Sequence, residues 1–139
     1  MSLERTYAMI KPDAVAAGNS GKIIDLIEKH GFRIVAMKKL KMTKEQGEAF
    51  YAVHKERPFF NSLITFMTEG PIVALVMERE DAVKQWRDLM GATNPANAAE
   101  GTIRKLYATS IERNAAHGSD APETAADETR FFFSSSELL

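Results

Sequence analysis

The sequence predicts an α/β fold of the α+β type, a ferredoxin-like split βαβ sandwich with helices packed on one face of a mainly antiparallel, four-stranded sheet. The apolar pattern gives the order strand, helix, strand, helical insert, strand, helix and strand along the chain. The 139 residues, 45% hydrophobic and 27% charged, suffice for a globular core without disulfides or a structural metal. No repeat, linker or change of composition is visible, so we expect a single domain over residues 1–139.

The first strand and the helix after it are bounded by residues with distinct backbone preferences. Side chains alternate from Tyr7 to Lys11 before Pro12, which lacks a backbone N–H and should end the strand. Ser20 can cap a helix whose isoleucines fall on one face, and Gly31 follows where a left-handed residue commonly ends a helix. We therefore expect a strand-to-helix unit with Lys11 at the exit of the strand.

The second strand is expected over residues 33–41, which are rich in Ile, Val and Met. Thr43 and Gln46 have the spacing of a capping box, in which each side chain satisfies a backbone N–H of the other residue. They predict the start of a second helix, which carries Phe50 and Tyr51.

The middle of the chain supplies a short helix, the strongest strand and a longer helix. Pro58 interrupts the pattern before an apolar segment at residues 59–67, which we expect to be helical. A Gly-Pro pair then precedes the expected strand at residues 72–78. Asp81 is placed to cap a helix whose apolar side carries Trp86.

The last third of the chain begins with a long segment at residues 91–104 that is rich in Gly, Ala, Asn, Pro and Thr. It is too polar for the core and too long for a simple turn, so we expect a functional loop. A helix can follow over residues 102–111, and residues 114–117 can form the final strand. The last helix is expected to start at Asp120 or Ala121.

Composition narrows the classes of partner. The formal net charge is −1, so no global field attracts nucleic acid or membranes. The chain contains no cysteine, which excludes disulfides and thiolate metal sites and fits a reducing compartment. The longest apolar run, residues 72–77, is far too short to span a bilayer, and Glu4 and Arg5 stand where a signal core would be apolar. We expect a cytoplasmic protein that needs neither a membrane nor nucleic acid.

The residues that can carry chemistry gather in the segment Asn-Ala-Ala-His-Gly-Ser-Asp at residues 114–120. Small neighbours leave the imidazole of His117 approachable, and a neutral imidazole is a good nucleophile near pH 7. Such a ring needs a group that holds its other nitrogen, and the local candidates are Ser119, Asp120, Glu123 and Glu128. Taken alone, a single histidine at a strand end is more often structural than catalytic. His30 and His54 lie in such ordinary contexts, and we assign neither a role.

With this segment the sequence resembles the nucleoside diphosphate kinase family, whose phosphorylated histidine lies in an Asn-x-x-His-Gly-Ser-Asp signature. Four other segments resemble the family in order and spacing: Lys11-Pro12-Asp13, Glu56-Arg57-Pro58-Phe59-Phe60, Gly91-Ala92-Thr93-Asn94-Pro95 and Gly101-Thr102-Ile103-Arg104. The resemblance extends over nearly the whole chain. It implies an enzyme, a phosphotransferase that moves the terminal phosphate of a nucleoside triphosphate such as ATP to a nucleoside diphosphate by a ping-pong mechanism. The intermediate would be a pros-phosphohistidine at His117.

The resemblance also implies roles for other residues. Those expected to bind ATP are Lys11, Phe59, Arg87, Thr93, Arg104 and Asn114. Arginine forks suit phosphate oxygens, and an aromatic ring stacks on any base. Those expected to support the histidine are Tyr51, Ser119 and Glu128, and Phe60 is expected to belong to the core. Mg²⁺ would be carried with the nucleotide, so no metal site of the protein itself is expected.

The sequence departs from the family pattern at Leu106, where an acidic residue usually stands, and this puts the bracing of the Arg104 loop in question. The end of the chain at Leu139 favours a bacterial-type homo-oligomer, either a tetramer or a hexamer. No phosphate-binding Gly-x-x-x-x-Gly-Lys-Ser/Thr loop occurs, which disfavours direct transfer. Two other functions stay open from the residues alone: a non-catalytic nucleotide-binding module and a histidine phosphocarrier.

Overall fold

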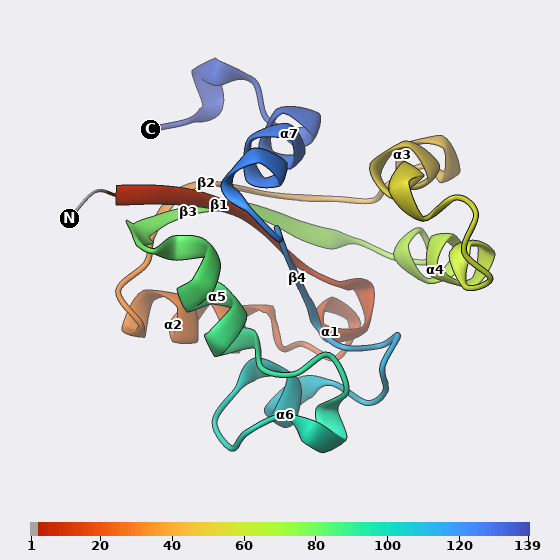
Figure 1. Ribbon diagram of the computed structural model, residues 1–139, viewed down its shortest axis with the longest axis horizontal. Helices are drawn as coiled ribbons and strands as arrows, with labels where there is room; N and C mark the ends of the chain where they lie inside the picture. The colour runs from red at the N-terminus through yellow and green to blue at the C-terminus, as the bar shows by residue number, and fades with distance from the viewer. Residues whose placement is uncertain (1–2) are drawn as a thin grey trace.

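The computed structural model describes residues 3–139 and is built around one antiparallel sheet (Figure 1). Its strands lie in the order β2-β3-β1-β4, and every neighbouring pair is antiparallel. The strands are β1 (Leu3–Ile10), β2 (Arg33–Leu40), β3 (Ile72–Glu80) and β4 (Ala116–Gly118). This arrangement confirms the predicted α+β sandwich and the predicted order of its strands.

Seven α-helices and three short 3-10 helices connect the strands within residues 3–139. The α-helices are α1 (Pro12–Ala16), α2 (Ser20–Lys29), α3 (Lys44–Phe50), α4 (Phe60–Met67), α5 (Ala82–Met90), α6 (Ile103–Tyr107) and α7 (Pro122–Phe132). The 3-10 helices are Ala52–His54, Pro95–Asn97 and Ser135–Glu137. Helix α1 was not predicted, because its single turn is too short to show a helical period.

Helices cover both faces of the sheet, which corrects the expectation that they cover one face. Along β1, Ala8 and Ile10 belong to a core cluster with α2 and α5, whereas Tyr7 and Met9 belong to a second cluster with α4 and α7. Figure 1 shows α2 and α5 on one side of the sheet and α7 on the other. All four side chains are fully buried, so β1 is the central strand of a three-layer structure.

Helix caps agree with the sequence in part. Thr43 and Gln46 form the predicted capping box, with the Gln46 N–H donating to Thr43 Oγ1 at 3.1 Å. Ser20 is the first residue of α2 and not its cap, because the cap position belongs to Asn19. Gly31 has the predicted left-handed conformation, with φ of 83°.

Asp81 occupies the predicted cap position of α5, but its side chain accepts no capping hydrogen bond. Its own backbone is left-handed, with φ of 54°, which turns the chain sharply from β3 into α5. The Val83 N–H donates instead to Glu4 Oε1 at 2.8 Å, so a residue from β1 satisfies the helix start.

The predicted loop at residues 91–104 is irregular apart from the turn Pro95–Asn97, and it leads into α6. Thr102 caps that helix by accepting from the Lys105 N–H at 3.3 Å. The helix ends at Tyr107, earlier than the predicted residue 111. Between residues 3 and 139 no helix combines the length and apolar character needed to cross a membrane.

Candidate active site

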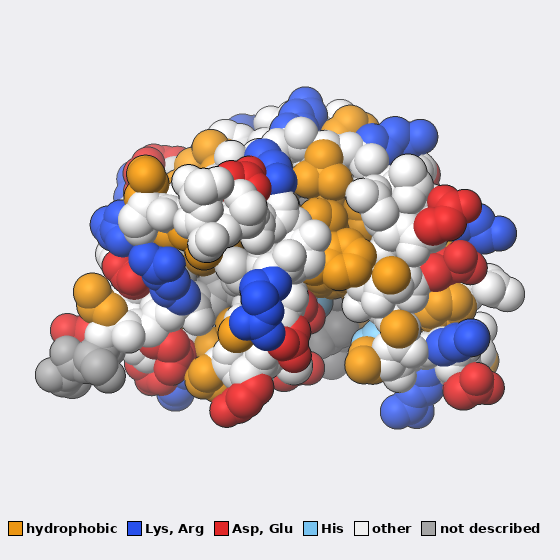
Figure 2. All heavy atoms as spheres, turned by 90° about the horizontal axis from the view of Figure 1, so that it is seen from above, with side chains coloured by type: hydrophobic (Ala, Val, Ile, Leu, Met, Phe, Trp, Pro, Cys, Tyr) orange, Lys and Arg blue, Asp and Glu red, His pale blue; other side chains and the backbone are white. Residues whose placement is uncertain are grey.

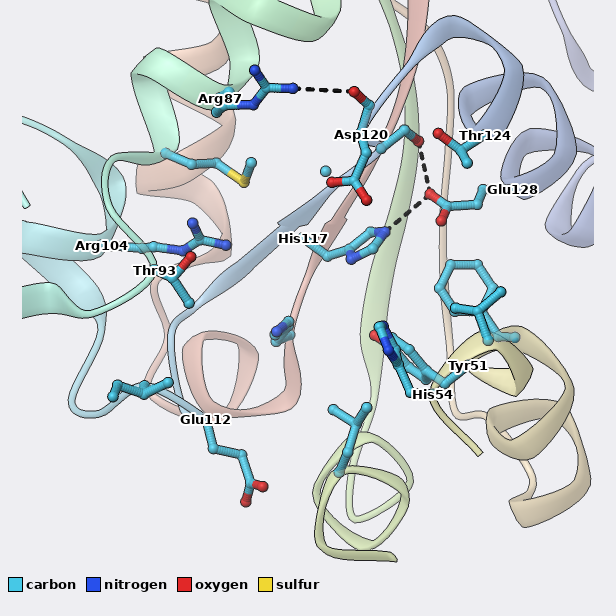
Figure 3. Close-up of a pocket in the computed structure, with 18 of the residues that line it drawn as sticks. Tyr51, His54, Arg87, Thr93, Arg104, Glu112, His117, Asp120, Thr124 and Glu128 are labelled. Atoms are coloured by element: carbon cyan, nitrogen blue, oxygen red, sulfur yellow. Dashed lines mark hydrogen bonds and ion pairs between the residues drawn. The ribbon is translucent and has the colours of Figure 1, made fainter. Parts of the chain in front are cut away.

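One pocket of about 900 Å³ gathers almost all the predicted functional residues (Figure 3). Those that line it are Lys11, Tyr51, Phe59, Arg87, Thr93, Arg104, His117, Ser119 and Glu128. Asn114 does not line the pocket, but its side chain contacts Lys11 from behind. The surface is hollowed in Figure 2, where histidine side chains are visible beside a group of apolar side chains. Segments from both ends and the middle of the chain therefore meet at one place.

His117 lies on the short strand β4, opposite Met9 of β1. Its Nε2 is 3.0 Å from Glu128 Oε1, and its backbone carbonyl accepts from Trp86 Nε1 at 3.1 Å. Within residues 3–139, no hydrogen bond involves its other ring nitrogen, Nδ1. The ring is therefore held through Nε2, and within this part of the chain Nδ1 makes no hydrogen bond.

Gly118 explains why the histidine is followed by glycine. A Cβ atom at this position would lie 2.5 Å from Cδ1 of Trp86 and 2.7 Å from Cε of Met90. Neither neighbour is the flexible end of an exposed side chain, because both residues are buried in the core. Glycine thus lets helix α5 pack directly on β4 beside His117.

Glu128 is the carboxylate that orients the histidine. Ser119 donates from Oγ to the same Oε1 atom at 2.7 Å, so two donors converge on one oxygen. Burial raises the pKa of Glu128, but the hydrogen bonds from His117 and Ser119 outweigh burial and hold that pKa below its usual value. An ionised Glu128 can only accept, so Nε2 carries the hydrogen and Nδ1 carries the lone pair in the neutral ring.

The other orienting candidates of the sequence do not contact the ring. Asp120 offers its backbone carbonyl to Arg87 Nη2 at 3.1 Å, and its exposed side chain faces the pocket. Glu123 is exposed on the first turn of α7. Glu128 and Ser119 together are therefore the pair that holds His117.

Three aromatic rings surround the imidazole. The ring centroids of Phe50, Tyr7 and Tyr51 lie 5.5, 6.0 and 6.2 Å from that of His117. Burial raises the pKa values of both tyrosines, so their phenols are neutral near pH 7. Of these residues the sequence had pointed to Tyr51 alone, because Tyr7 and Phe50 look like ordinary core residues. Packing against these three rings restricts the orientation of the imidazole.

Lys11 and Asn114 form a buried polar pair at the pocket. Lys11 Nζ donates to Asn114 Oδ1 at 2.8 Å, and the two residues are 8% and 4% exposed. Burial, followed by the positive charge of Arg104, lowers the pKa of Lys11 to about 8. Keeping Lys11 charged in the pocket therefore costs desolvation free energy, which a bound anion would offset.

Arg104 is braced by backbone carbonyls and not by an acidic side chain. Its guanidinium donates to the carbonyls of Gly91, Asn114 and Ala116 at 3.0, 3.4 and 2.9 Å. Leu106 is exposed on the same helix, so the loop holds without an acidic residue at that position. Burial lowers the pKa of Arg104, which nonetheless stays positively charged because guanidinium is so basic.

Two sides of the pocket are lined by residues of different chemical character. Arg87, Thr93 and Arg104 lie on one side of His117 in Figure 3, and Tyr51 and His54 on the other. Both Arg87 and Thr93 are exposed, which leaves them accessible to a ligand.

Apolar side chains line the outer part of the pocket. Phe59 is 47% exposed, whereas Phe60 is 9% exposed in the core, as predicted. Ile111 is 59% exposed and also lines the pocket. His54, which the sequence left without a role, lies with its ring centroid 5.5 Å from that of Phe59. A flat apolar group could enter between these side chains.

The pocket offers cations and not a cage of metal ligands. Lys11 lines it from the junction between β1 and α1, Arg87 from α5 and Arg104 from α6. Among the described residues, no group of three or more His, Asp or Glu side chains is arranged to hold a metal ion. The donor set suits an anion such as a polyphosphate.

Comparison with known proteins identifies relatives over the whole chain. The family model for nucleoside diphosphate kinase matches residues 4–138. The nucleoside diphosphate kinase of Bradyrhizobium diazoefficiens is 61% identical over 139 residues, which cover 100% of this chain and 99% of the relative. That of Geotalea uraniireducens is 59% identical over 137 residues, which cover 99% of this chain and 100% of the relative.

Solved structures agree with the sequence relatives. A crystal structure of the Aquifex aeolicus nucleoside diphosphate kinase has a TM-score of 0.97 at 44% identity and covers 99% of this chain and 100% of that chain. The halophilic enzyme of Halobacterium salinarum in complex with CDP has a TM-score of 0.95 at 40% identity, covering 99% and 92%. This chain therefore belongs to the nucleoside diphosphate kinase family and is an enzyme of that activity, a phosphotransferase that acts on nucleotides.

Proposed function

We propose that His117 carries the transferred phosphoryl group between a nucleoside triphosphate and a nucleoside diphosphate. The single observation behind this proposal is the contact of its Nε2 with Glu128 Oε1 at 3.0 Å, which directs the lone pair of Nδ1 into a cation-lined pocket. Nδ1 is the pros nitrogen of the ring, so the intermediate is a pros-phosphohistidine.

The reaction proceeds in two half-reactions that are each other's reverse. Nδ1 attacks the terminal phosphorus of a triphosphate such as ATP, the bond to the bridging oxygen breaks, and the diphosphate leaves with that oxygen. A second diphosphate enters, its terminal oxygen attacks the same phosphorus, and the phosphorus–nitrogen bond breaks. Glu128 stabilises the positive charge that the ring gains in the first step and loses in the second.

The phosphates are bound by cations from separate parts of the chain. Arg87 and Arg104 offer guanidinium groups to phosphate oxygens, Lys11 adds an ammonium, and Thr93 adds a hydroxyl. The substrate is the magnesium complex of the nucleotide, as family members use it. The ion would come with the nucleotide, where its charge would offset that of the phosphates, and it would need no dedicated protein ligands.

The base and the sugar are recognised without groups specific to one base. Phe59 provides an exposed ring for stacking, and Lys11 offers its ammonium to the sugar hydroxyls. Asn114 contributes to this site by accepting from Lys11 Nζ. The relative from Halobacterium salinarum was solved with CDP, which supports a nucleoside diphosphate in the corresponding pocket here. We expect similar turnover for several nucleoside diphosphates.

The two functions that stayed open from the residues alone fit the site less well. A nucleotide sensor needs stacking and phosphate contacts, but it does not need a nucleophile oriented by a carboxylate. A phosphocarrier for signalling needs access for a partner protein, whereas His117 is only partly exposed within a nucleotide-sized pocket. We further infer one catalytic domain, a homo-oligomer that is a tetramer or hexamer, and a cytoplasmic location.

The proposal is tested by isolating the phosphorylated enzyme. The protein is incubated with magnesium and ATP labelled in its terminal phosphate, and the labelled peptide is identified after digestion at alkaline pH. We expect acid-labile, alkali-stable label on the peptide that contains His117, with phosphorus on Nδ1, and its release on addition of a nucleoside diphosphate. Label on another residue, or label that the diphosphate does not remove, would refute the mechanism.

Nucleotide affinity is expected to depend on the protonation of Lys11. Because its pKa is lowered to about 8, the ammonium is charged below that value and loses its proton as pH rises above it. A nucleoside diphosphate is fully ionised in this range, so its dissociation constant should rise about tenfold between pH 7.5 and pH 10. A bound anion favours the charged lysine and moves the rise to a somewhat higher pH.

Calorimetric titration with the magnesium complex of ADP measures this effect. Lys11→Arg is the matched variant, because an arginine stays charged throughout the range and should flatten the profile. A flat profile for the wild-type protein, or an unchanged profile for the variant, would exclude Lys11 as the titrating group.

A further inference from the structure

The backbone before His117 adopts a strained three-residue turn. The Ala116 N–H donates to the Asn114 carbonyl at 2.8 Å, and Ala115 between them has φ of 73°. A γ-turn with a positive central φ is rare, because a side chain with a Cβ atom is crowded in this conformation. The strain lies two residues from the proposed nucleophile, so it must be held by surrounding contacts.

Asp13 provides the side-chain contact to the central residue of that turn. Its Oδ2 accepts from the Ala115 N–H at 3.1 Å, across 102 positions of sequence. The Lys11 N–H donates to the Ala115 carbonyl at 2.9 Å, so both polar groups of Ala115 are bound by the start of α1. The short helix α1 lies beside the start of β4 in Figure 1.

The carbonyls of the two residues that flank Ala115 are bound by Arg104. The guanidinium of Arg104 donates to the carbonyls of Asn114 and Ala116. These two residues flank Ala115, whose side chain is fully buried. The carboxylate of Asp13 accepts from the turn, and the guanidinium of Arg104 donates to it. These charge-assisted hydrogen bonds can offset the backbone strain at Ala115.

Asp13 does not act on the substrate itself. It is absent from the residues that line the pocket, and its Oδ1 is buried without a hydrogen-bond partner among residues 3–139. Keeping a half-buried carboxylate in this place is costly, and burial raises the pKa of Asp13. The hydrogen bond from the Ala115 N–H and the positive charge of Lys11 offset part of that cost.

We propose that Asp13 is a positioning residue, which holds the turn at Ala115 and thereby sets the direction of two active-site side chains. The turn directs Asn114 towards Lys11 Nζ at 2.8 Å, and it leads into β4 so that His117 meets Glu128. This inference rests on the proposed function of His117 and adds the contact between Asp13 and Ala115 that keeps the imidazole in place.

The test measures how fast His117 is phosphorylated by labelled ATP in single-turnover experiments. Asp13→Ala should lower that rate constant by about tenfold to a hundredfold, because misplacement of a reacting group by about 1 Å has effects of this size. Asp13→Asn keeps an oxygen acceptor and should lose less. Asp25→Ala removes an exposed carboxylate from α2, far from the pocket lining, and should keep the wild-type rate.

Rescue by glycine distinguishes positioning from a general structural role. Glycine adopts positive φ at little cost, so Ala115→Gly should restore the rate of Asp13→Ala at least about fivefold. A loss in Asp13→Ala that Ala115→Gly does not restore would overturn the proposal, as would a rate within twofold of the wild type. If Asp13→Ala does not fold, the rates of Asp13→Asn and of Asp13→Asn with Ala115→Gly are compared instead. A lowered rate that glycine does not restore would again overturn the proposal.

Failure of the inference and failure of the proposed function give different results. If the wild-type protein takes no label on His117, the mechanism itself is wrong and the positioning role is refuted with it. If the wild type is labelled and Asp13→Ala is labelled equally fast, the mechanism stands and only the role of Asp13 is refuted. If Asp13→Ala is labelled slowly but completely, and Ala115→Gly restores the rate, both the proposed function and the role of Asp13 are supported.

Discussion

Replacement of His117 by alanine is expected to lower the rate of phosphate exchange by at least about 10⁴-fold, the largest effect of any substitution in the chain. The reason is that a covalent route loses its acceptor entirely when the nucleophile is removed, while binding contacts alone give little catalysis. The cations Lys11, Arg87 and Arg104 remain in the pocket, so affinity for a nucleoside diphosphate should change by less than about threefold.

The measurement combines coupled-assay kinetics with calorimetric titration of ADP. His30→Ala is the matched control, because this histidine is exposed at the end of α2 and its Nδ1 contacts the Leu26 carbonyl outside the pocket. It should keep full activity. An exchange rate above about one hundredth of wild type in His117→Ala would exclude a phosphohistidine route at this position, because that route needs the imidazole of His117 as its acceptor.

The fold was predictable where local signals are strong. The Thr43–Gln46 capping box and the left-handed Gly31 depend on interactions within a few residues. The strands around residues 33–41 and 72–78 pair with distant segments, but their apolar composition can be seen locally in the sequence. The two-sided burial of β1 was not predicted, although its apolar run from Tyr7 to Ile10 is typical of a strand covered on both faces.

Helix caps that distant residues supply could not be predicted from the sequence, for a physical reason. Helix α5 starts with a hydrogen bond from the Val83 N–H to Glu4, a residue on another strand, and no local pattern reports such a contact. Asp81 has the residue type of a cap, but its left-handed backbone turns its side chain away from that task. Residue type alone therefore located the helix start but named the wrong acceptor.

The candidate site was predicted from a resemblance more than from spacing. Residue chemistry alone left His117 as a nucleophile with several carboxylates that could orient it, and the structure singles out Glu128 with Ser119. The aromatic neighbours Tyr7 and Phe50 were missed, because they are 110 and 67 positions away from His117 in the sequence and look like core residues. Such contacts arise only when β1, α3 and β4 are brought together.

Replacement of Glu128 by alanine is expected to lower the rate of His117 phosphorylation by about a hundredfold, the second-largest effect. Without the carboxylate, the proton no longer prefers Nε2, so part of the population carries it on Nδ1 and cannot attack. The charge that forms on the ring during transfer also loses its partner. Glu128→Gln keeps an amide oxygen that can accept from Nε2–H and should lose about tenfold.

Single-turnover labelling of both variants measures the effect on the first half-reaction. Glu123→Ala is the matched control, because it removes an exposed carboxylate from the first turn of the same helix. It should keep the wild-type rate. If Glu128→Ala reacted within threefold of wild type, orientation through Nε2 would not contribute, and another group would have to select the reactive nitrogen.

Stability gives an independent readout of the same contacts. The pKa of Glu128 in the folded state lies below its unfolded-state value of about 4.5, because His117 and Ser119 donate hydrogen bonds to the carboxylate. Folding therefore favours the ionised form of Glu128. The resulting stabilisation is fully present above the unfolded-state pKa and is lost as pH falls through the lower folded-state pKa. Urea unfolding should therefore find Glu128→Gln less stable than wild type at pH 7, with the difference shrinking towards pH 3. A difference that stayed constant over this range would mean that packing, and not the charge of Glu128, holds the carboxylate against the ring.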